Sequence, residues 1–134
     1  MCSDELPKKY FKSLSGIYII QAQSIISEIL RKIIITGGTG FIGRNLIKKL
    51  SNKRQFSVAL IANTPNMSGI EFSENNLLRF HAEDVRDREA ILKIFREETA
   101  DVCIQLAAKI SVADSIKYPQ ETMDINVRGT INVL

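Results

Sequence analysis

The glycines at positions 37, 40 and 43 most constrain what this 134-residue chain can fold into, because of what stands on either side of them. Residues 32–36 before them are apolar and β-branched, which predicts a short strand buried on both faces. After them, apolar residues recur at helical spacing over residues 41–50, which predicts a helix with one buried face. A glycine turn between a buried strand and a helix indicates an α/β unit.

The same alternation of strand and helix continues along the chain. Residues 63–76 are rich in Asn, Ser and Pro and predict a loop, Asp87 suits a helix N-cap, and after a second loop Pro119 opens a helix to the chain end. Further strands are expected at residues 58–61, 77–81 and 102–106. Strands that alternate with helices pair in parallel. The predicted fold class is α/β, a Rossmann-like doubly wound parallel sheet of order 3-2-1-4, truncated after about four strands.

Each glycine of the turn has its own physical role. Gly37 permits a tight exit from the strand, Gly40 leaves room for a pyrophosphate close to the backbone, and Gly43 lets the helix pack against the strand. Unpaired amides at the positive end of the helix dipole then face the anion. A glycine turn that binds nothing is the alternative. The further amides expected around the anion are those of Thr39, Phe41 and Ile42.

Four stretches of the sequence resemble one known family. Residues 36–43, Thr-Gly-Gly-Thr-Gly-Phe-Ile-Gly, resemble the signature of the extended short-chain dehydrogenase/reductases, the NAD-dependent epimerase/dehydratase family that works on nucleotide sugars. Residues 83–87, 106–108 and 126–134 resemble later motifs of that family, in the same order. The resemblance therefore extends over residues 31–134 and is more specific than the glycines alone.

The resemblance implies a cofactor site and the residues that form it. Asp84 and Val85 match the family's contacts to adenine, and Ala107 and Ala108 match a turn that lies beside the nicotinamide ribose. In the family, the complete enzyme transfers a hydride between the sugar and a tightly held NAD. The expected cofactor is NAD, and the expected cofactor-binding residues are Gly37, Thr39, Gly40, Phe41, Ile42, Gly43, Asn63, Asp84, Val85, Ala107 and Ala108.

The end of the second predicted strand departs from the family pattern. NAD-binding members carry an acidic residue there that bonds the adenosine ribose, whereas this chain has Ala62 followed by Asn63. No lysine or arginine between Arg54 and Arg79 is placed to accept the 2′-phosphate of NADP. Asn63 can bond the ribose through its amide, but a lost charge-assisted hydrogen bond costs on the order of 1.5–3 kcal/mol. The sequence therefore leaves the choice between NAD and NADP open.

The family's catalytic Tyr-x-x-x-Lys motif does not occur in this sequence, because no tyrosine is followed by a lysine four residues later. We therefore predict no catalytic residue and no metal ligand, and expect the chain alone to be inactive. The predicted function is that of the NAD(P)-binding portion of a nucleotide-sugar epimerase/dehydratase-type oxidoreductase that lacks its substrate region. A non-enzymatic dinucleotide-binding or interaction module and an inactive truncated product are the alternatives.

Residues 1–30 are predicted to be an N-terminal extension, separate from the Rossmann part at residues 31–134. Their apolar side chains can share one side of a helix, and their uncharged stretch is too short to cross a bilayer. Cys2 and Cys103 form no metal or disulfide pattern, which favours a reduced, cytoplasmic protein with Cys103 buried.

The expected partners follow from charge and from the predicted sheet. A net charge of +3 with interleaved acidic and basic residues predicts no nucleic-acid partner, and no membrane partner is expected. The expected ligand is a dinucleotide, with a nucleotide sugar only if a C-terminal part completes the enzyme. Residues 102–106 would form an edge strand, so self-association or pairing through this strand is a further expectation.

Overall fold

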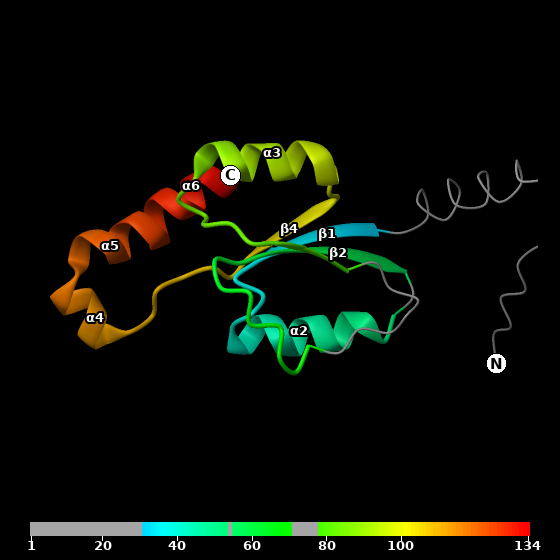
Figure 1. Ribbon diagram of the computed structural model, residues 1–134, viewed down its shortest axis with the longest axis horizontal. Coiled ribbons are helices and arrows are strands. Elements are labelled where there is room, and N and C mark those ends of the chain that lie inside the picture. The colour runs from blue at the N-terminus through cyan, green and yellow to red at the C-terminus, as the bar shows by residue number, and fades with distance from the viewer. Residues whose placement is uncertain (1–30, 54, 71–77) are drawn as a thin grey trace, which may run out of the picture.

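The computed structural model describes residues 31–53, 55–70 and 78–134, which fold around a four-stranded parallel sheet (Figure 1). The strand order is β3-β2-β1-β4, which confirms the predicted fold class. The order reverses between β1 and β4, and ligands of doubly wound sheets bind in the crevice at the carboxyl ends of the strands there. The strands are β1 (Arg31–Thr36), β2 (Phe56–Ile61), β3 (Leu78–His81) and β4 (Val102–Gln105).

The two central strands contain the most deeply buried part of the sheet. Ile34 and Ile35 of β1 and Leu60 and Ile61 of β2 are fully buried, as their β-branched or long apolar side chains predict. β2 begins at Phe56, earlier than predicted, because Phe56 and the residue after it pair with the first residues of β1. Each edge strand is shorter and less buried than the two central strands.

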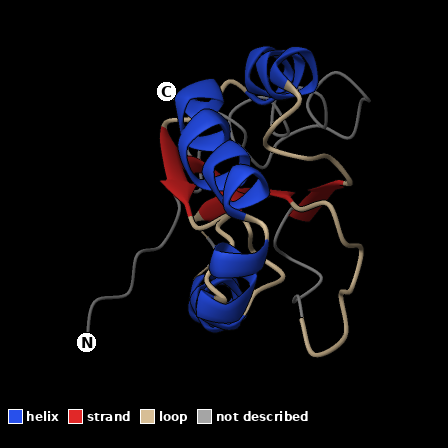
Figure 2. Ribbon diagram, turned by 90° about the vertical axis from the view of Figure 1, so that its left-hand side faces the viewer, coloured by secondary structure: helices blue, strands red, loops and turns tan. Residues whose placement is uncertain are grey.

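Helices cover both faces of the sheet (Figures 1 and 2). On one face, α2 (Phe41–Ser51) packs its buried Ile47 against the Ile33 and Ile35 side of β1. On the other face, α3 (Arg88–Glu98) packs against Ile34, and α6 (Gly129–Val133) packs beside α3. Successive side chains of a strand point to opposite faces, so β1 supplies both layers of the core.

The ends of α3 are fixed by side chains. As predicted, Asp87 is the N-cap, and its carboxylate accepts a hydrogen bond from the Ala90 amide at 3.1 Å. At the other end the buried Glu98 lies 3.0 Å from the Arg79 guanidinium and 2.7 Å from Nε2 of His81. These contacts tie the last turn of α3 to β3.

The C-terminal segment contains more helix than the sequence predicts. The region between β4 and Pro119, expected to be a loop, contains the short helix α4 (Val112–Lys117), capped by the Ser111 hydroxyl, which accepts from the Asp114 amide at 3.2 Å. The helix predicted from Pro119 runs to the end of the chain through three successive parts. These are α5 (Pro119–Met123), the π-helical turn η2 (Asp124–Arg128) and α6.

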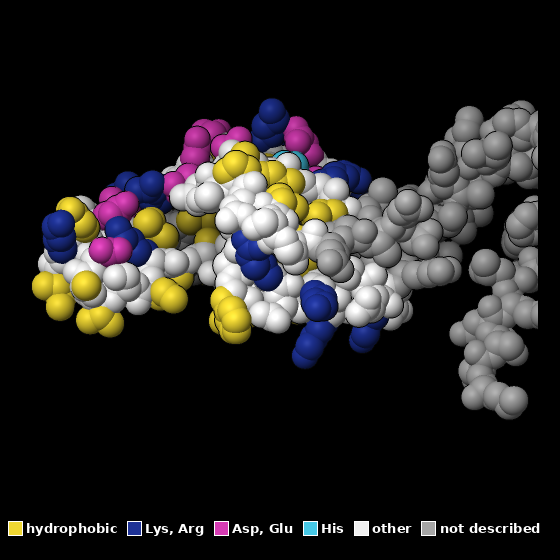
Figure 3. Space-filling view, turned by 60° about the horizontal axis from the view of Figure 1, so that its bottom comes forward, with side chains coloured by type: hydrophobic (Ala, Val, Ile, Leu, Met, Phe, Trp, Pro, Cys, Tyr) yellow, Lys and Arg dark blue, Asp and Glu magenta, His cyan; other side chains and the backbone are white. Residues whose placement is uncertain are grey.

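Apolar side chains are exposed on the β4 side of the molecule. Ile110, Val112 and Ile116 reach solvent around α4, where Figure 3 shows hydrophobic side chains at one end of the molecule. The expectation that Cys103 is buried is wrong: its side chain is exposed. Among the described strands β4 pairs with β1 alone, so no described strand pairs with the outer edge of β4.

Within the described ranges no helix has the length and apolar character needed to span a membrane. The predicted helical extension at residues 1–30 lies outside the described residues, as do residues 71–77 at the end of the predicted loop and the start of the third predicted strand. Residues 63–70 form no helix or strand, in agreement with that prediction.

Candidate functional site

The glycine turn leaves β1 through a sharp bend at Gly37, as predicted. Gly37 has φ +64°, a conformation that favours glycine, and its amide donates to the carbonyl of Ile61 at 2.8 Å. A Cβ at Gly37 would lie 2.5 Å from the backbone nitrogen of Ala107, just beyond β4. The bend is therefore pressed against the neighbouring chain and has no room for a side chain.

Gly43 allows a second close approach, with a different partner from the expected one. We expected it to let the helix pack against the strand. A Cβ there would instead lie 2.5 Å from the carbonyl oxygen of Gly38, within the turn itself. Gly43 thus folds the first turn of α2 back onto the glycine turn and holds the helix N-terminus beside it.

Gly40 is the N-cap of α2 and is exposed. Its backbone angles, φ −74° and ψ 174°, are available to any residue, and beyond its chain neighbours an added Cβ would meet only the Gly37 oxygen, at 3.2 Å. Among the described residues, no acceptor pairs with the amides of Phe41, Ile42 and Gly43. The first turn of α2 contains no acidic residue. This helix end therefore presents free donors and a partial positive charge to an anion.

These amides stand at the edge of a pocket of about 440 Å³. Every residue that the sequence predicts to bind the cofactor lines it: Gly37, Thr39, Gly40, Phe41, Ile42, Gly43, Asn63, Asp84, Val85, Ala107 and Ala108. The pocket is also lined by residues that the sequence did not single out as binding residues, namely Ile61, Ala62, Glu83, Leu106, Ile110 and Ile125. Glu83 and Leu106 adjoin predicted residues, whereas the place of Ile125 depends on tertiary packing and has no local signal.

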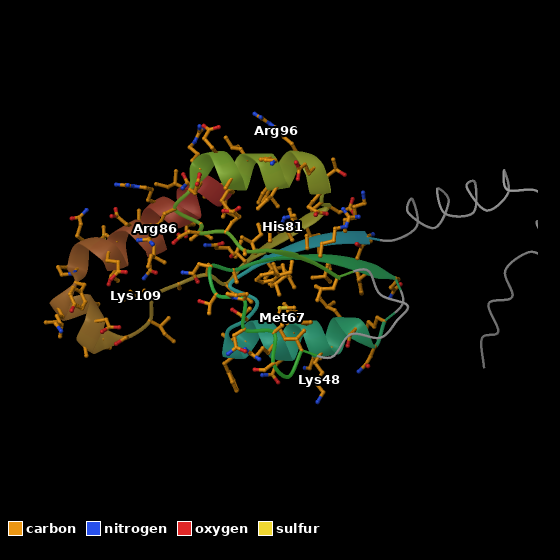
Figure 4. The ribbon with its side chains drawn as sticks, in the orientation of Figure 1. Lys48, Met67, His81, Arg86, Arg96 and Lys109 are labelled. Atoms are coloured by element: carbon orange, nitrogen blue, oxygen red, sulfur yellow. The ribbon has the colours of Figure 1, made fainter. Side chains whose placement is uncertain are left out.

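Asp84, which follows β3, is held as a carboxylate in the wall of the pocket. It accepts hydrogen bonds from the Arg86 amide at 2.9 Å and from Nη2 of the Arg86 guanidinium at 2.7 Å. The Arg86 guanidinium lowers the pKa of Asp84 below its ordinary value. Figure 4 shows Arg86 on the side of the molecule where the C-terminal helices lie. Val85 beside it is buried. Because its side chain is apolar, a polar contact between Val85 and a ligand would have to come from its backbone.

The wall at Ala107 and Ala108 is positioned by the side chain of Thr36, which the sequence did not single out. Thr36 is completely buried at the end of β1. Its hydroxyl donates to the Gln105 side chain and accepts from the amides of Leu106 and Ala107, at 3.1 and 3.2 Å. The end of β1 thereby fixes where the chain turns after β4.

A second clamp holds the chain just beyond this wall. Asn126, in η2, accepts a hydrogen bond from the Lys109 amide at 2.8 Å and donates its own amide to the Lys109 carbonyl at 3.0 Å. This pairing fixes the C-terminal helical segment against the loop after β4, and Ile110 and Ile125, which line the pocket, are the next residues. The family motif contains this asparagine, but the sequence alone does not reveal its partner.

Arg44 connects the glycine turn to the loop that follows β2. Its Nε donates to the Thr39 carbonyl at 2.6 Å, its Nη2 donates to the Asn66 carbonyl at 2.9 Å, and its Nη1 donates to the Ser68 carbonyl. A basic residue near the 2′ position is expected in the segment after the second strand, whereas Arg44 precedes that strand in the sequence. In the fold, the first turns of α2 bring Arg44 beside the loop that follows β2.

The arrangement suits an extended ligand with a negative charge at its middle. Free amides face one part of the pocket, an ionised carboxylate and a buried valine form another, and small alanine side chains leave space at the crevice beside β4. No group of His, Cys, Asp and Glu that suits a metal ion occurs in the part of the chain that the structure describes. These features fit a dinucleotide, whose pyrophosphate, adenine and nicotinamide ribose require those three environments.

Comparisons with known proteins agree with this geometry. The family profile described as GDP-mannose 4,6 dehydratase matches residues 34–134. A bifunctional UDP-glucose 4-epimerase and UDP-xylose 4-epimerase from Pisum sativum is 32% identical over 114 residues, which cover 77% of this chain and 32% of that protein. A putative UDP-glucose 4-epimerase from Methanocaldococcus jannaschii is 38% identical over 104 residues, with 76% and 32% covered.

Solved structures give the same result. UDP-glucose 4-epimerase from Thermus thermophilus, in complex with NAD, superimposes with a TM-score of 0.63 and 30% identity over 76% of this chain and 32% of that one. The Thermotoga maritima enzyme with UDP-glucose gives a TM-score of 0.65 and 28% identity, again over 76% and 32%. The chain thus spans about a third of the length of the relatives it matches. Through residues 34–134 it belongs to the GDP-mannose 4,6 dehydratase family of NAD-dependent epimerases and dehydratases.

Proposed function

We propose that this chain binds a nicotinamide dinucleotide, NAD or NADP, as the cofactor-binding part of a nucleotide-sugar epimerase or dehydratase. The observation that carries the proposal is the set of free amides at residues 41–43, which open onto a pocket whose other walls contain every further predicted contact. The relatives with bound NAD or UDP-glucose support the ligand class. When bound, the dinucleotide supplies the centre that accepts and returns a hydride.

The residues of this chain would bind and orient the dinucleotide. The amides of Phe41, Ile42 and Gly43 would donate to the pyrophosphate, for which Gly40 leaves the space. Asp84, kept ionised by Arg86, would accept from the exocyclic amine of adenine.

The opposite end of the pocket would take the nicotinamide half of the ligand. Ala107 and Ala108 would lie beside its ribose, in the crevice where the strand order reverses. Their small side chains would let the ring approach the end of β4. Thr36 would keep this wall in place through its hydrogen bonds to the turn.

The sequence contains no Tyr-x-x-x-Lys motif, so we expect this chain alone to bind without catalysing turnover. A nucleotide sugar would be a substrate only together with a part that supplies the catalytic pair. The second candidate is a dinucleotide-binding module without enzymatic activity. Turnover of UDP-glucose by the purified chain would contradict both candidate functions.

We also propose that the free edge of β4 pairs with another chain. Its outer backbone groups have no partner strand among the described residues, and Val102 and Cys103 are exposed beside it. Size-exclusion chromatography should show association that increases with concentration, and a compact monomer at high concentration would contradict the proposal. The cytoplasmic location stays a prediction.

The test of the binding site is a titration with NADH, followed by the fluorescence of the ligand. A Gly40→Val side chain would occupy the space of the pyrophosphate without backbone strain. Losing even two of the three proposed charge-assisted hydrogen bonds predicts an affinity loss of about 100-fold or more. The unfolding midpoint should change little, because Gly40 packs against little else.

Asn52→Val is the matched control, since it places the same side chain at the opposite end of α2. Its affinity for NADH should equal that of the unaltered chain. If folded Gly40→Val bound NADH as tightly as the unaltered chain, our placement of the site would be wrong. If the unaltered chain bound neither NADH nor NADPH, the proposed function itself would be refuted.

A further inference from the structure

One side of the C-terminal helical segment contacts the chain at two places beside the pocket. Asn126 of η2 bonds the backbone of Lys109 after β4, and Asn132 of α6 bonds the turn after β3. Gly129, midway between the two asparagines, lies against Val85 of that turn. Positions three residues apart in a helix lie on the same side of it. A single helical surface therefore supports both the turn after β3 and the loop after β4.

Asn132 contacts the middle of the turn that contains Asp84. Its side-chain nitrogen donates to the Val85 carbonyl at 2.9 Å and to the Arg86 carbonyl at 3.1 Å. The turn is closed by the Asp87 amide, which donates to the Asp84 carbonyl at 2.9 Å. Because one side chain bonds two successive carbonyls, it fixes both the position and the orientation of this closed turn relative to α6.

Gly129 brings the helix backbone close to the same turn. Gly129 and Val85 are both buried, and a Cβ at Gly129 would lie 2.7 Å from Cγ2 of Val85. Interiors of proteins are packed without space for such an overlap, so the helix lies at this distance because residue 129 is glycine. The apolar contact limits how near the turn can come to α6, and the hydrogen bonds of Asn132 limit how far it can move away.

The position of the turn decides where a carboxylate stands in the pocket. Asp84 and Val85 line the pocket, whereas Asn132 is not among the described residues that line it. The Asp84 carboxylate is bound to Arg86 of the same turn, so it moves with the turn. A hydrogen bond weakens steeply when its donor and acceptor are displaced or misaligned. A small shift of the turn would therefore weaken any bond between Asp84 and a ligand.

We propose that Asn132 is a positioning residue for the base of the dinucleotide: it holds the turn where Asp84 can accept a hydrogen bond from the exocyclic amine of adenine. The inference rests on the proposed function and deepens it by naming what makes the pocket select an aminopurine. Asn132 acts through Asp84 and does not touch the ligand. A hydrogen bond to a charged acceptor contributes roughly 10- to 100-fold in affinity, so base selectivity of this size should depend on Asn132.

The test compares 5′-AMP with purine riboside 5′-monophosphate, which has hydrogen in place of the amino group. Calorimetric titration of the full chain should show 5′-AMP binding at least about tenfold more tightly. Asn132→Leu has a similar size and no donor, and it should bring the ratio of the two affinities close to one by weakening 5′-AMP alone. An unchanged ratio, or an equal loss for both nucleotides, would overturn the proposal.

Thr130→Val is the matched control on the same helix. The Thr130 hydroxyl donates to the Asn126 carbonyl at 2.7 Å, so this variant also removes a side-chain hydrogen bond while it keeps the shape of the side chain. It should lower the unfolding midpoint by an amount similar to that of Asn132→Leu and leave the ratio unchanged. A ratio that fell equally in both variants would indicate general loosening of the helix and would overturn the proposal.

Gly129→Ala disturbs the turn while Asn132 stays in place. The new Cβ would displace Val85 and should also lower the ratio, and the higher helix propensity of alanine offsets part of the cost in stability. This variant keeps the proposal testable if Asn132→Leu does not fold. An unchanged ratio in folded Gly129→Ala would contradict the dependence of base selectivity on the position of the turn.

A double-variant cycle tests whether Asn132 acts through Asp84. In Asp84→Ala the acceptor is missing, so the ratio should be close to one and Asn132→Leu should not change it further. An effect of Asn132→Leu that persists without Asp84 would overturn the proposal. The two proposals fail differently: tight NADH binding with equal affinities for the two monophosphates refutes the positioning role alone, whereas a chain that binds neither NADH nor NADPH refutes the pocket and this role with it.

Discussion

At the glycine turn, called here the glycine end of the pocket, the groups that face the ligand are backbone amides. At residues 83–85 and at Asn63 the groups available to a ligand are mostly side chains. The glycine end is fixed by close contacts that leave no space for a Cβ, as at Gly37. The other end is fixed by hydrogen bonds such as those between Asp84 and Arg86, which solvent also reaches. Substitutions at the first end should therefore act through steric overlap, and those at the second by smaller, graded amounts.

The largest effect on stability is expected for Gly37→Ala. The new Cβ would lie 2.5–2.7 Å from backbone atoms of Leu106 and Ala107, which cannot move without shifting β4. Adding the cost of a left-handed conformation, we expect a loss of about 3 kcal/mol or more in the free energy of unfolding. Urea denaturation monitored by circular dichroism measures it.

Gly69→Ala is the matched control, because Gly69 also has a positive φ, at +73°, yet its Cβ would meet only Arg44 Nη1, at 3.9 Å. This variant should lose only the conformational cost of about 1–2 kcal/mol. The difference between the two variants isolates the overlap with the end of β4. Equal losses would mean that the glycine end is no more sterically restricted than an exposed loop.

A middle-sized effect is expected for Thr36→Val, which keeps the shape of the side chain. Losing the hydroxyl leaves the Ala107 amide and the Gln105 side-chain oxygen without their partner in a buried place, at a cost of about 1–3 kcal/mol. The affinity for NADH should also fall, because the wall at Ala107 and Ala108 loses its anchor. Unfolding curves and NADH titrations of the same preparation measure both.

Thr36→Ser keeps the hydroxyl and removes only a methyl group, which costs about 1 kcal/mol by lost burial. Its NADH affinity should stay close to that of the unaltered chain. If Val and Ser at this position weakened NADH binding equally, the hydrogen bonds of Thr36 would not be what positions the wall.

The difference between the two ends also explains how far the sequence could predict the site. The glycine turn follows from local patterns, because turn, strand and helix N-terminus are adjacent in the chain, whereas the pocket residues after β3 and β4 were expected from the family resemblance. Arg44 and Thr36 were missed because their partners lie far away: Arg44 reaches Ser68 from another element, and Thr36 reaches Ala107 across the sheet. Such contacts depend on the register of β1 with β4 and on the path of the loop after β2, which no local pattern contains.

Two further differences between the predicted and the observed structure also depend on contacts with distant parts of the chain. Cys103 stands in an apolar run, and this pattern predicts burial, but the exposed edge of β4 decides the outcome. On the last helix Ile125 and Val133 pack against the core, whereas Val127 and Ile131 are exposed. Periodicity identifies helices and strands better than it identifies which of their faces are covered.

The smallest effect is expected for Asp84→Asn, at the side-chain end of the pocket. Both partners of the Asp84–Arg86 pair are partly exposed, at 28% and 39% of their side-chain surface, so the pair should contribute only about 0.5–1 kcal/mol. Because the folded protein lowers the pKa of Asp84, this stabilisation is complete above the ordinary pKa of about 4 and is lost as the pH falls through the lowered value. The unaltered chain should therefore exceed Asp84→Asn in stability at pH 7, and the two unfolding curves should converge toward pH 2. A difference that stayed constant from pH 7 to pH 2 would show that Asp84 stabilises the turn through something other than its charge, and the contrast between the two ends of the pocket would then be one of position rather than of chemistry.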